Sequence, residues 1–224
     1  MATWMAHLRL AKKVLDASYP LEVEPFLIGN VAPDAGVPDE HWLNYNPPKH
    51  ISHWTGDEED GWPQPERFFE AYIRAGERES DPERFAFLAG YYLHLIVDVA
   101  WNLIVVSPMK EQPGFPEKIG DHPDLVTAIR RDWYGQDFVY LRSHPDNIFT
   151  LQFLPITQVP DYLDYFPPGA IAERVRYIQD LYQRTDVDLD RPFLYLTTEG
   201  MDAFVEQAEV DALAGMEKVM ERMP

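Results

Sequence analysis

The sequence predicts an all-α fold, a single-domain helical bundle built around a buried central helix and joined by long loops rich in Pro and Gly. Three observations predict it. Apolar residues recur at helical spacing in several segments, alternating patterns typical of strands are scarce, and residues 85–106 form an apolar run without Lys, Arg or Glu. No repeat or linker divides the 224 residues, so we expect one domain over residues 1–224.

The first predicted helix runs from Thr3 to about Ser18, because apolar residues recur there every three or four positions. His7 shares one side of this helix with Leu10 and Val14. We therefore expect the imidazole of His7 to face the core.

The next segment, residues 25–61, is rich in Pro, Gly and Asn and predicts a long ordered loop. Loops of this length in compact domains are usually functional. Residues 64–78 then predict a second amphipathic helix.

The apolar run 85–106 is long enough to cross a bilayer. However, His94, Asp98 and Asn102 recur every four residues and form a polar stripe along one side. A bundle can satisfy such a stripe internally, so we predict a buried central helix and no stable membrane insertion. Ser80 or Asp81 caps its start, just ahead of a proline.

The second half of the chain predicts three more helices. A loop over about 107–124 leads to a helix over 124–141, and the proline-rich residues 144–168 predict a cap or irregular arm. Two C-terminal helices follow over about 169–184 and 198–222, the second capped by Thr197 or Thr198.

Composition excludes several functions. The chain has 38 acidic against 19 basic residues and a formal charge of -19, which disfavours binding to nucleic acid or to an anionic membrane. It has no Cys, so disulfides, thiolate metal sites and cysteine nucleophiles are excluded. The N-terminal residues lack the pattern of a signal peptide, and we expect a cytoplasmic protein. The oligomeric state is not predictable from the sequence.

His94 and Asp98 are the strongest candidates for metal ligands. Four residues apart on a helix, they present two ligand atoms on one face. Burying Asp98 costs several kcal/mol without a compensating cation or strong donors, and the run holds no Lys or Arg. A metal ion supplies that charge, and the alternative is a buried hydrogen-bonded pair. Without Cys, such a site suits zinc, with iron or manganese possible.

The order of His7, then GNVAPDAG (29–36), KHISHW (49–54) and FLAGYYLHLIVDVAW (87–101) resembles the zinc-dependent phospholipase C family. The resemblance covers about residues 4–102. It implies an all-helical fold and, residue by residue, the metal ligands His7, Asp34, His53, His94 and Asp98. His53 is preferred to His50 because Ser52-His53-Trp54 matches the family's pattern of a small hydroxyl, His and an aromatic residue. His41 and His50 are expected to be loop or substrate-side residues.

The chain departs from the family pattern in two places. Secreted members bind zinc through the amino group of a processed N-terminal Trp, whereas this chain starts at Met1. The family's later His-x-x-x-Glu is also missing after Asp98. We therefore expect one or two ions. Asp132 or Asp137 could complete the site, although solvated carboxylates are the more favoured interpretation of both.

The resemblance implies a metal-dependent hydrolase of small-molecule or lipid-derived phosphoesters. Asp34 would act as a metal ligand and as the general base, and the loop aromatics Trp42, Tyr45, Trp54 and Trp62 could wall an apolar pocket. The metal-binding core would span about residues 4–141. Two alternatives stay open. One is a non-catalytic, metal-stabilised binding or scaffold protein. The other is an HD-type phosphohydrolase, which needs an adjacent His-Asp pair that the chain lacks.

Overall fold

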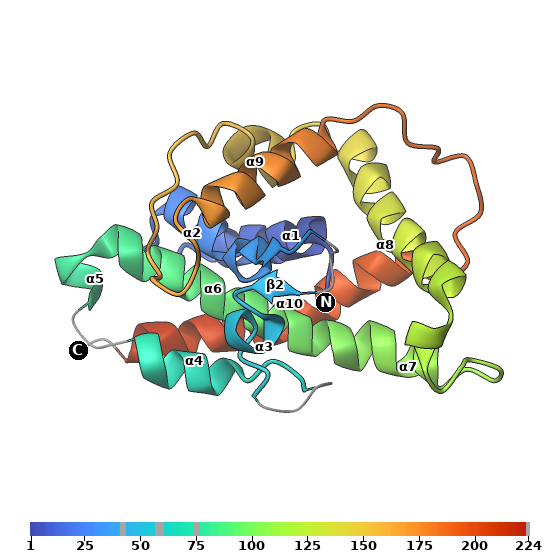
Figure 1. The fold of residues 1–224 in the computed structure, drawn as a ribbon. Helices are drawn as coiled ribbons and strands as arrows, with labels where there is room; N and C mark the ends of the chain where they lie inside the picture. The colour runs from blue at the N-terminus through green and yellow to red at the C-terminus, as the bar shows by residue number, and fades with distance from the viewer. Residues whose placement is uncertain (41–43, 57–60, 74–76, 223–224) are drawn as a thin grey trace.

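A computed structural model describes residues 1–40, 44–56, 61–73 and 77–222. The described residues form ten α-helices and one two-stranded antiparallel sheet, which confirms the predicted all-α fold (Figure 1). In chain order, the α-helices are α1 (Trp4–Asp16), α2 (Val23–Gly29), α3 (Lys49–Ser52), α4 (Pro65–Tyr72), α5 (Glu77–Ser80), α6 (Pro82–Trp101), α7 (Ser107–Lys110), α8 (Pro123–Ser143), α9 (Ala170–Tyr182) and α10 (Thr198–Glu221). The strands are β1 (Val37–Pro38) and β2 (Tyr45–Asn46).

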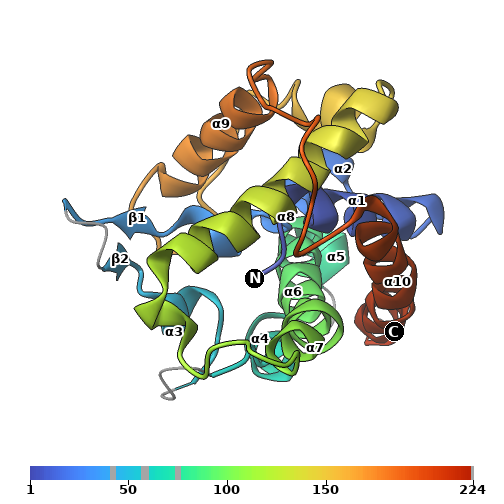
Figure 2. The ribbon, with the colours of Figure 1, turned by 90° about the vertical axis from the view of Figure 1, so that its right-hand side faces the viewer.

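Helix α6 is the centre of the fold and packs against α1, α2, α4 and α10 (Figures 1 and 2). The Asp81 side chain caps it by accepting a hydrogen bond from the Arg84 amide at 3.1 Å, and Pro82 occupies its first turn. Past Trp101 the chain continues as a π-helix, Asn102–Val106, directly into α7. The stretch Pro82–Lys110 is long and apolar enough to cross a membrane, but 67% of its most apolar window is buried within the protein.

The prediction of one long loop over residues 25–61 is wrong at its beginning. Residues 23–29 form α2, which lies against α6 with its apolar side chains buried. Gly29 and Gly90 allow this close crossing: a Cβ on Gly90 would lie 2.1 Å from the Phe26 carbonyl oxygen, and one on Gly29 would lie 2.0 Å from that of Phe87. After α2 the chain does turn frequently, through the 3-10 helix Ala32–Ala35, the small sheet and α3.

The predicted helix over 64–78 is shorter in the structure, which has α4 over Pro65–Tyr72 and a separate α5. The loop predicted over 107–124 contains α7 and the 3-10 helix Ile119–Asp121. The arm over 144–168 is irregular except for a π-helix, Phe149–Phe153.

Three helices complete the fold. Helix α8 is close to the predicted 124–141, and α9 and α10 match the two predicted C-terminal helices. Thr197 caps α10 by accepting from the Gly200 amide at 3.1 Å. Both ribbon views place α9 and α10 on opposite sides of the molecule (Figures 1 and 2).

Candidate metal centre

The five sequence-predicted ligands lie together in the interior. They come from four segments: His7 from α1, Asp34 from the 3-10 helix, His53 from the end of α3, and His94 and Asp98 from α6. Their ligand atoms form two groups, each with all atoms within 4.8 Å of one another. One group is His7, His94 and Asp98, the other is Asp34, His53 and His94, and His94 belongs to both. No observation tests whether these residues bind metal, so their role as ligands stays a prediction.

The α6 pair forms the floor of the site. His94 and Asp98 have no solvent exposure, and His94 Nε2 lies 3.5 Å from Asp98 Oδ2. The other carboxylate oxygen, Oδ1, lies 3.5 Å from His7 Nε2. Neither separation is a hydrogen bond. His94 and Asp98 therefore do not form the buried hydrogen-bonded pair that the sequence left open as the alternative to two metal ligands.

Backbone contacts orient the ring of His94. Its Nδ1 lies 2.9 Å from the carbonyl oxygen of Asn30, at the end of α2. Because a carbonyl oxygen only accepts, the proton of a neutral ring resides on Nδ1, and the lone pair of Nε2 points into the cluster. This is how proteins hold a histidine ready to bind a metal.

His53 is held in a similar way. Its Nδ1 lies 3.0 Å from the hydroxyl of Ser52, and the Ser52 carbonyl accepts a hydrogen bond from the buried hydroxyl of Tyr91 on α6. The other ring nitrogen, Nε2, lies 3.3 Å from Asp34 Oδ1 and 3.8 Å from Asp98 Oδ2. His53 therefore lies between the two carboxylates of the cluster.

Asp34 is the carboxylate nearest to solvent, with 10% of its side chain exposed. The indole Nε1 of Trp4 donates a hydrogen bond of 2.7 Å to its Oδ2. Burial alone would raise the pKa of Asp34, but the adjacent imidazole of His53 and the charge of His94 outweigh burial and hold the pKa below its ordinary value. Asp34 is therefore ionised at neutral pH.

The histidines differ in basicity. Burial, with the charge of His94, lowers the pKa of His7 to about 4, so His7 is neutral at physiological pH. Burial would also lower the pKa of His94, but the Asp98 carboxylate raises it above the ordinary value. A neutral imidazole such as that of His7 is the form that binds metal.

Asp98 is a fully buried carboxylate that accepts one hydrogen bond of 2.8 Å from the Ala2 amide. Burial would raise its pKa, but the amino terminus and His94 hold the pKa well below its ordinary value. Among the described residues, its Oδ2 has no hydrogen-bond partner, and neither do the Nε2 atoms of His7, His53 and His94. Buried polar atoms almost always have partners. The orphaned Nε2 atoms of the three histidines each lie 3.5–3.8 Å from an oxygen of the Asp98 carboxylate. Such an arrangement fits a transition-metal ion, and the oxygen and imidazole donors fit zinc.

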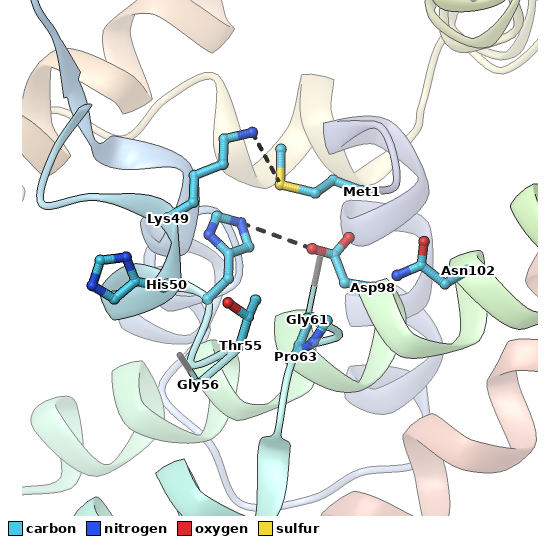
Figure 3. Close-up of a pocket in the computed structure, with 10 residues that line it drawn as sticks. Met1, Lys49, His50, Thr55, Gly56, Gly61, Pro63, Asp98 and Asn102 are labelled. Carbon is cyan, nitrogen blue, oxygen red and sulfur yellow. Dashed lines mark hydrogen bonds and ion pairs between the residues drawn. The ribbon is translucent and has the colours of Figure 1, made fainter. Parts of the chain in front are cut away.

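Two cavities open onto the cluster and share Met1, Lys49 and His53. One, of about 520 Å³, is lined by Asp98, Asn102, His50 and Thr55 among others (Figure 3). In Figure 3, Lys49 and Met1 lie on one side of the Asp98 carboxylate and Asn102 on the other. The second cavity, of about 310 Å³, is lined by Asp34, Trp4, Tyr134 and Arg174 among others. The site is therefore reachable from two directions, past Asp98 and past Asp34.

Asp132 and Asp137 do not join the cluster, and the expectation that they are solvated is wrong. Asp132 is 3% exposed, pairs with Arg191 and accepts from the amides of Leu194 and Tyr195 at 2.6 and 2.8 Å. Asp137 is 1% exposed and accepts from the hydroxyls of Thr3 and Tyr182, both at 2.6 Å. Through these contacts, Asp132 ties α8 to the segment before α10, and Asp137 ties α8 to the N-terminal residues and to α9.

The other described histidines do not belong to the cluster. His50 lines the larger cavity, and its role as a loop or substrate-side residue stays a prediction. His122 and His144 are exposed. His41 lies outside the described residues.

Of the loop aromatics, Tyr45 lines the smaller cavity, Trp54 lines a separate pocket and Trp62 is 43% exposed. Trp42 lies outside the described residues. The predicted aromatic wall is therefore built differently, from Trp4, Trp133 and Tyr134 together with Tyr45.

Sequence reasoning missed three contributors, Ala2, Trp4 and Asn30. Asn30 lies within the GNVAPDAG motif, which located it near the site. The motif gave no sign that the backbone carbonyl of Asn30 contacts His94. Trp4 precedes His7 by three positions on one helix face, which placed it near the site. The Ala2 amide carried no signal, because it acts through the backbone.

Comparison with known proteins agrees with this geometry. The sequence profile of the family described as zinc dependent phospholipase C matches residues 5–147, which include all five clustered residues. No curated protein and no solved structure matches the chain. The matched segment covers more than half of the 224 residues. The chain therefore belongs to the zinc dependent phospholipase C family.

Proposed function

We propose that this protein hydrolyses phosphoesters at a zinc centre held by His7, Asp34, His53, His94 and Asp98. The observation that carries the proposal is the convergence of four buried ligand atoms that have no hydrogen-bond partner among the described residues. Zinc bound there supplies Lewis acidity toward a phosphoryl oxygen and lowers the pKa of water. Membership in a zinc-dependent hydrolase family supports the same reaction class.

The side chains of this chain have separate tasks in that reaction. The buried His7, His94 and Asp98 hold the metal. Asp34 is ionised, lies at the rim of a cavity and is fixed by Trp4, so it is the group placed to accept the proton of the attacking water.

The substrate is a small-molecule or lipid-derived phosphoester, and the proposed location is the cytoplasm. The charge of the bound metal would offset the repulsion between an anionic ester and a protein with a formal charge of -19. The alternative is a non-catalytic protein of the same fold that zinc stabilises.

Hydrolysis is tested with zinc-loaded protein and a panel of phosphodiesters and phosphomonoesters. We expect turnover of at least one ester, and Asp34→Asn should lower kcat roughly a hundredfold or more through loss of the proton acceptor. Asp16→Asn is the matched control, since Asp16 lies exposed at the end of α1 and pairs with Lys12. Stoichiometric zinc with no turnover across the panel would refute the hydrolase and leave the non-catalytic alternative.

A further inference from the structure

Three cationic side chains line the smaller cavity beside Asp34: Lys49, Arg130 and Arg174. In a chain with twice as many acidic as basic residues, a basic side chain has many possible partners. Elsewhere in the described residues such pairs are frequent, as in Arg9–Asp202 and Lys13–Glu209. Within that described part, none of the three cavity cations forms an ion pair with a carboxylate.

Arg174, on α9, is held in place before any ligand arrives. Its guanidinium lies 5.6 Å from the ring centroid of Trp4 and 5.4 Å from that of Tyr177. Its Nη2 donates to the Gly36 carbonyl at 3.4 Å, and its buried Nε has no partner among the described residues. The side chain is half-buried, so it has unused donors and little freedom to lose.

Trp4 connects Arg174 to the metal centre. The indole ring that lies against Arg174 also donates its N–H to Asp34, one of the five clustered residues. Tyr134 of α8 meets the same indole edge-on, with the ring centroids 5.7 Å apart. The cavity and the cluster therefore share one aromatic wall.

The other two cations reach the cavity from different elements. Arg130 lies on α8, one turn before Tyr134, and its charge opposes the raising of the Tyr134 pKa by burial. Lys49 begins α3, with its Nζ 5.7 Å from the ring centroid of Tyr45 and 3.7 Å from Met1 Sδ. Segments far apart in the sequence thus bring three positive charges to one cavity of about 310 Å³, enough for a small organic anion.

We propose that Lys49, Arg130 and Arg174 form an anion subsite that binds a second anionic group of the substrate. The inference rests on the proposed function, in which the metal centre holds the first phosphoryl group. The preferred substrates are then phosphoesters whose alcohol portion carries a further phosphate or carboxylate, rather than zwitterionic esters. A guanidinium recognises either group through paired hydrogen bonds.

The test compares ligands that carry one or two phosphates on the same carbon chain. Glycerol and hexanediol, each as the monophosphate and the bisphosphate, are titrated calorimetrically into zinc-loaded protein, with phosphocholine as the zwitterionic ligand. We expect at least one bisphosphate to bind about tenfold or more tightly than its monophosphate, and phosphocholine to bind no better than the monophosphates. Equal affinities of monophosphate and bisphosphate for both alcohols would overturn the subsite.

Variants assign the preference to the three cations. Arg174→Gln should abolish the preference for the bisphosphate and leave monophosphate affinity nearly unchanged. Arg176→Gln, two positions along α9 and exposed, is the matched control and should keep the preference. If Arg174→Gln fails to fold, Arg130→Gln replaces it, because Arg130 is exposed. A preference that survives loss of the cation would contradict the proposal.

The same chemistry could come from a free metabolite or from a lipid headgroup. Flotation with phosphatidylcholine vesicles, with and without a phosphatidylinositol phosphate, distinguishes the two sources. Vesicle binding that Arg174→Gln abolishes supports the subsite with a lipid source, and a soluble bisphosphate preference alone supports it with a free source. Binding is measured without turnover, so the subsite can fail while hydrolysis holds, and hydrolysis can fail while the subsite holds.

Discussion

The imidazole rings of His7 and His94 lie face to face, with their centroids 3.9 Å apart and their planes within 2° of parallel. The Asp98 carboxylate faces both rings: its Oδ1 lies 3.5 Å from Nε2 of His7, and its Oδ2 lies 3.5 Å from Nε2 of His94. These atoms are too far apart for hydrogen bonds and too buried for bulk water. A cation among them would satisfy all three side chains at once.

Removing the metal should lower thermal stability. A ligand that binds only the folded state stabilises it by about 4 kcal/mol at a thousandfold excess over Kd, or roughly 10 °C in Tm for a chain of this size. We expect chelation to lower the Tm by an amount of this order and added zinc to restore it. Calorimetry measures both steps, and an unchanged Tm in metal-free protein would show that the cluster is stable without an ion.

Trp4→Phe should impair turnover more than metal binding. The substitution removes the N–H that fixes Asp34 Oδ2 but keeps an aromatic ring against Arg174. Hydrogen bonds to charged groups contribute about 1.5–3 kcal/mol, so kcat should fall roughly tenfold to a hundredfold. Zinc content should stay near that of the unmodified protein.

Trp62→Phe is the control for this variant, because Trp62 is 43% exposed and lines neither cavity of the cluster. Equal kcat for the two variants would contradict the positioning role of Trp4.

Gly90→Ala should destabilise the fold at the crossing of α2 and α6. The new Cβ would lie 2.1 Å from the Phe26 carbonyl oxygen and 2.9 Å from the Asn30 amide, so the helices must separate. We expect a loss of roughly 1–3 kcal/mol in the free energy of unfolding. Asn30 also orients His94, so zinc affinity should fall too.

Denaturant titration measures the stability of the Gly90→Ala variant. Gly120→Ala is the matched control, because nothing lies within 4 Å of its added Cβ. Equal stabilities of the two variants would show that α2 can move without cost.

Asp137 should make stability depend on pH. Burial raises its pKa from 3.8 to about 7, against the opposing hydrogen bonds from Thr3 and Tyr182. The folded state then holds a proton that the unfolded state has released, so stability falls as pH rises between about 4 and 7. Asp137→Asn removes this titration. The stability of the variant minus that of the unmodified protein should therefore rise with pH, by up to about 1.4 kcal/mol per pH unit.

Denaturant titrations at several pH values between about 4 and 7 measure this difference. A difference that stays constant with pH would show that Asp137 titrates near the ordinary value in the folded protein.

The sequence predicted the elements whose periodicity was clear. The polar stripe on an otherwise apolar run located α6 and its His94–Asp98 pair, and Asp81 and Pro82 located its start. Helix α2 was missed because it is short, contains Pro25 and has an unbroken apolar run rather than a periodic pattern.

The partners of Asp132 and Asp137 could not be predicted. Arg191 lies 59 residues from Asp132, and Thr3 lies 134 residues from Asp137. Helix α8 is polar, so its sequence pattern does not distinguish a buried carboxylate that binds a distant segment from one exposed to solvent. The contacts of the Asn30 carbonyl and the Ala2 amide were hidden for a different reason, since backbone groups are the same in every residue.

The zinc content of protein purified without a metal-affinity tag tests the central claim most directly. Elemental analysis should give at least about one zinc per chain, and Asp98→Asn should lose more zinc than Asp137→Asn, because Asp98 faces the imidazoles whereas Asp137 binds hydroxyls. Less than about a tenth of an equivalent, with no uptake on titration, would contradict a metal centre in this protein. Equal or greater loss in Asp137→Asn would place the metal away from α6.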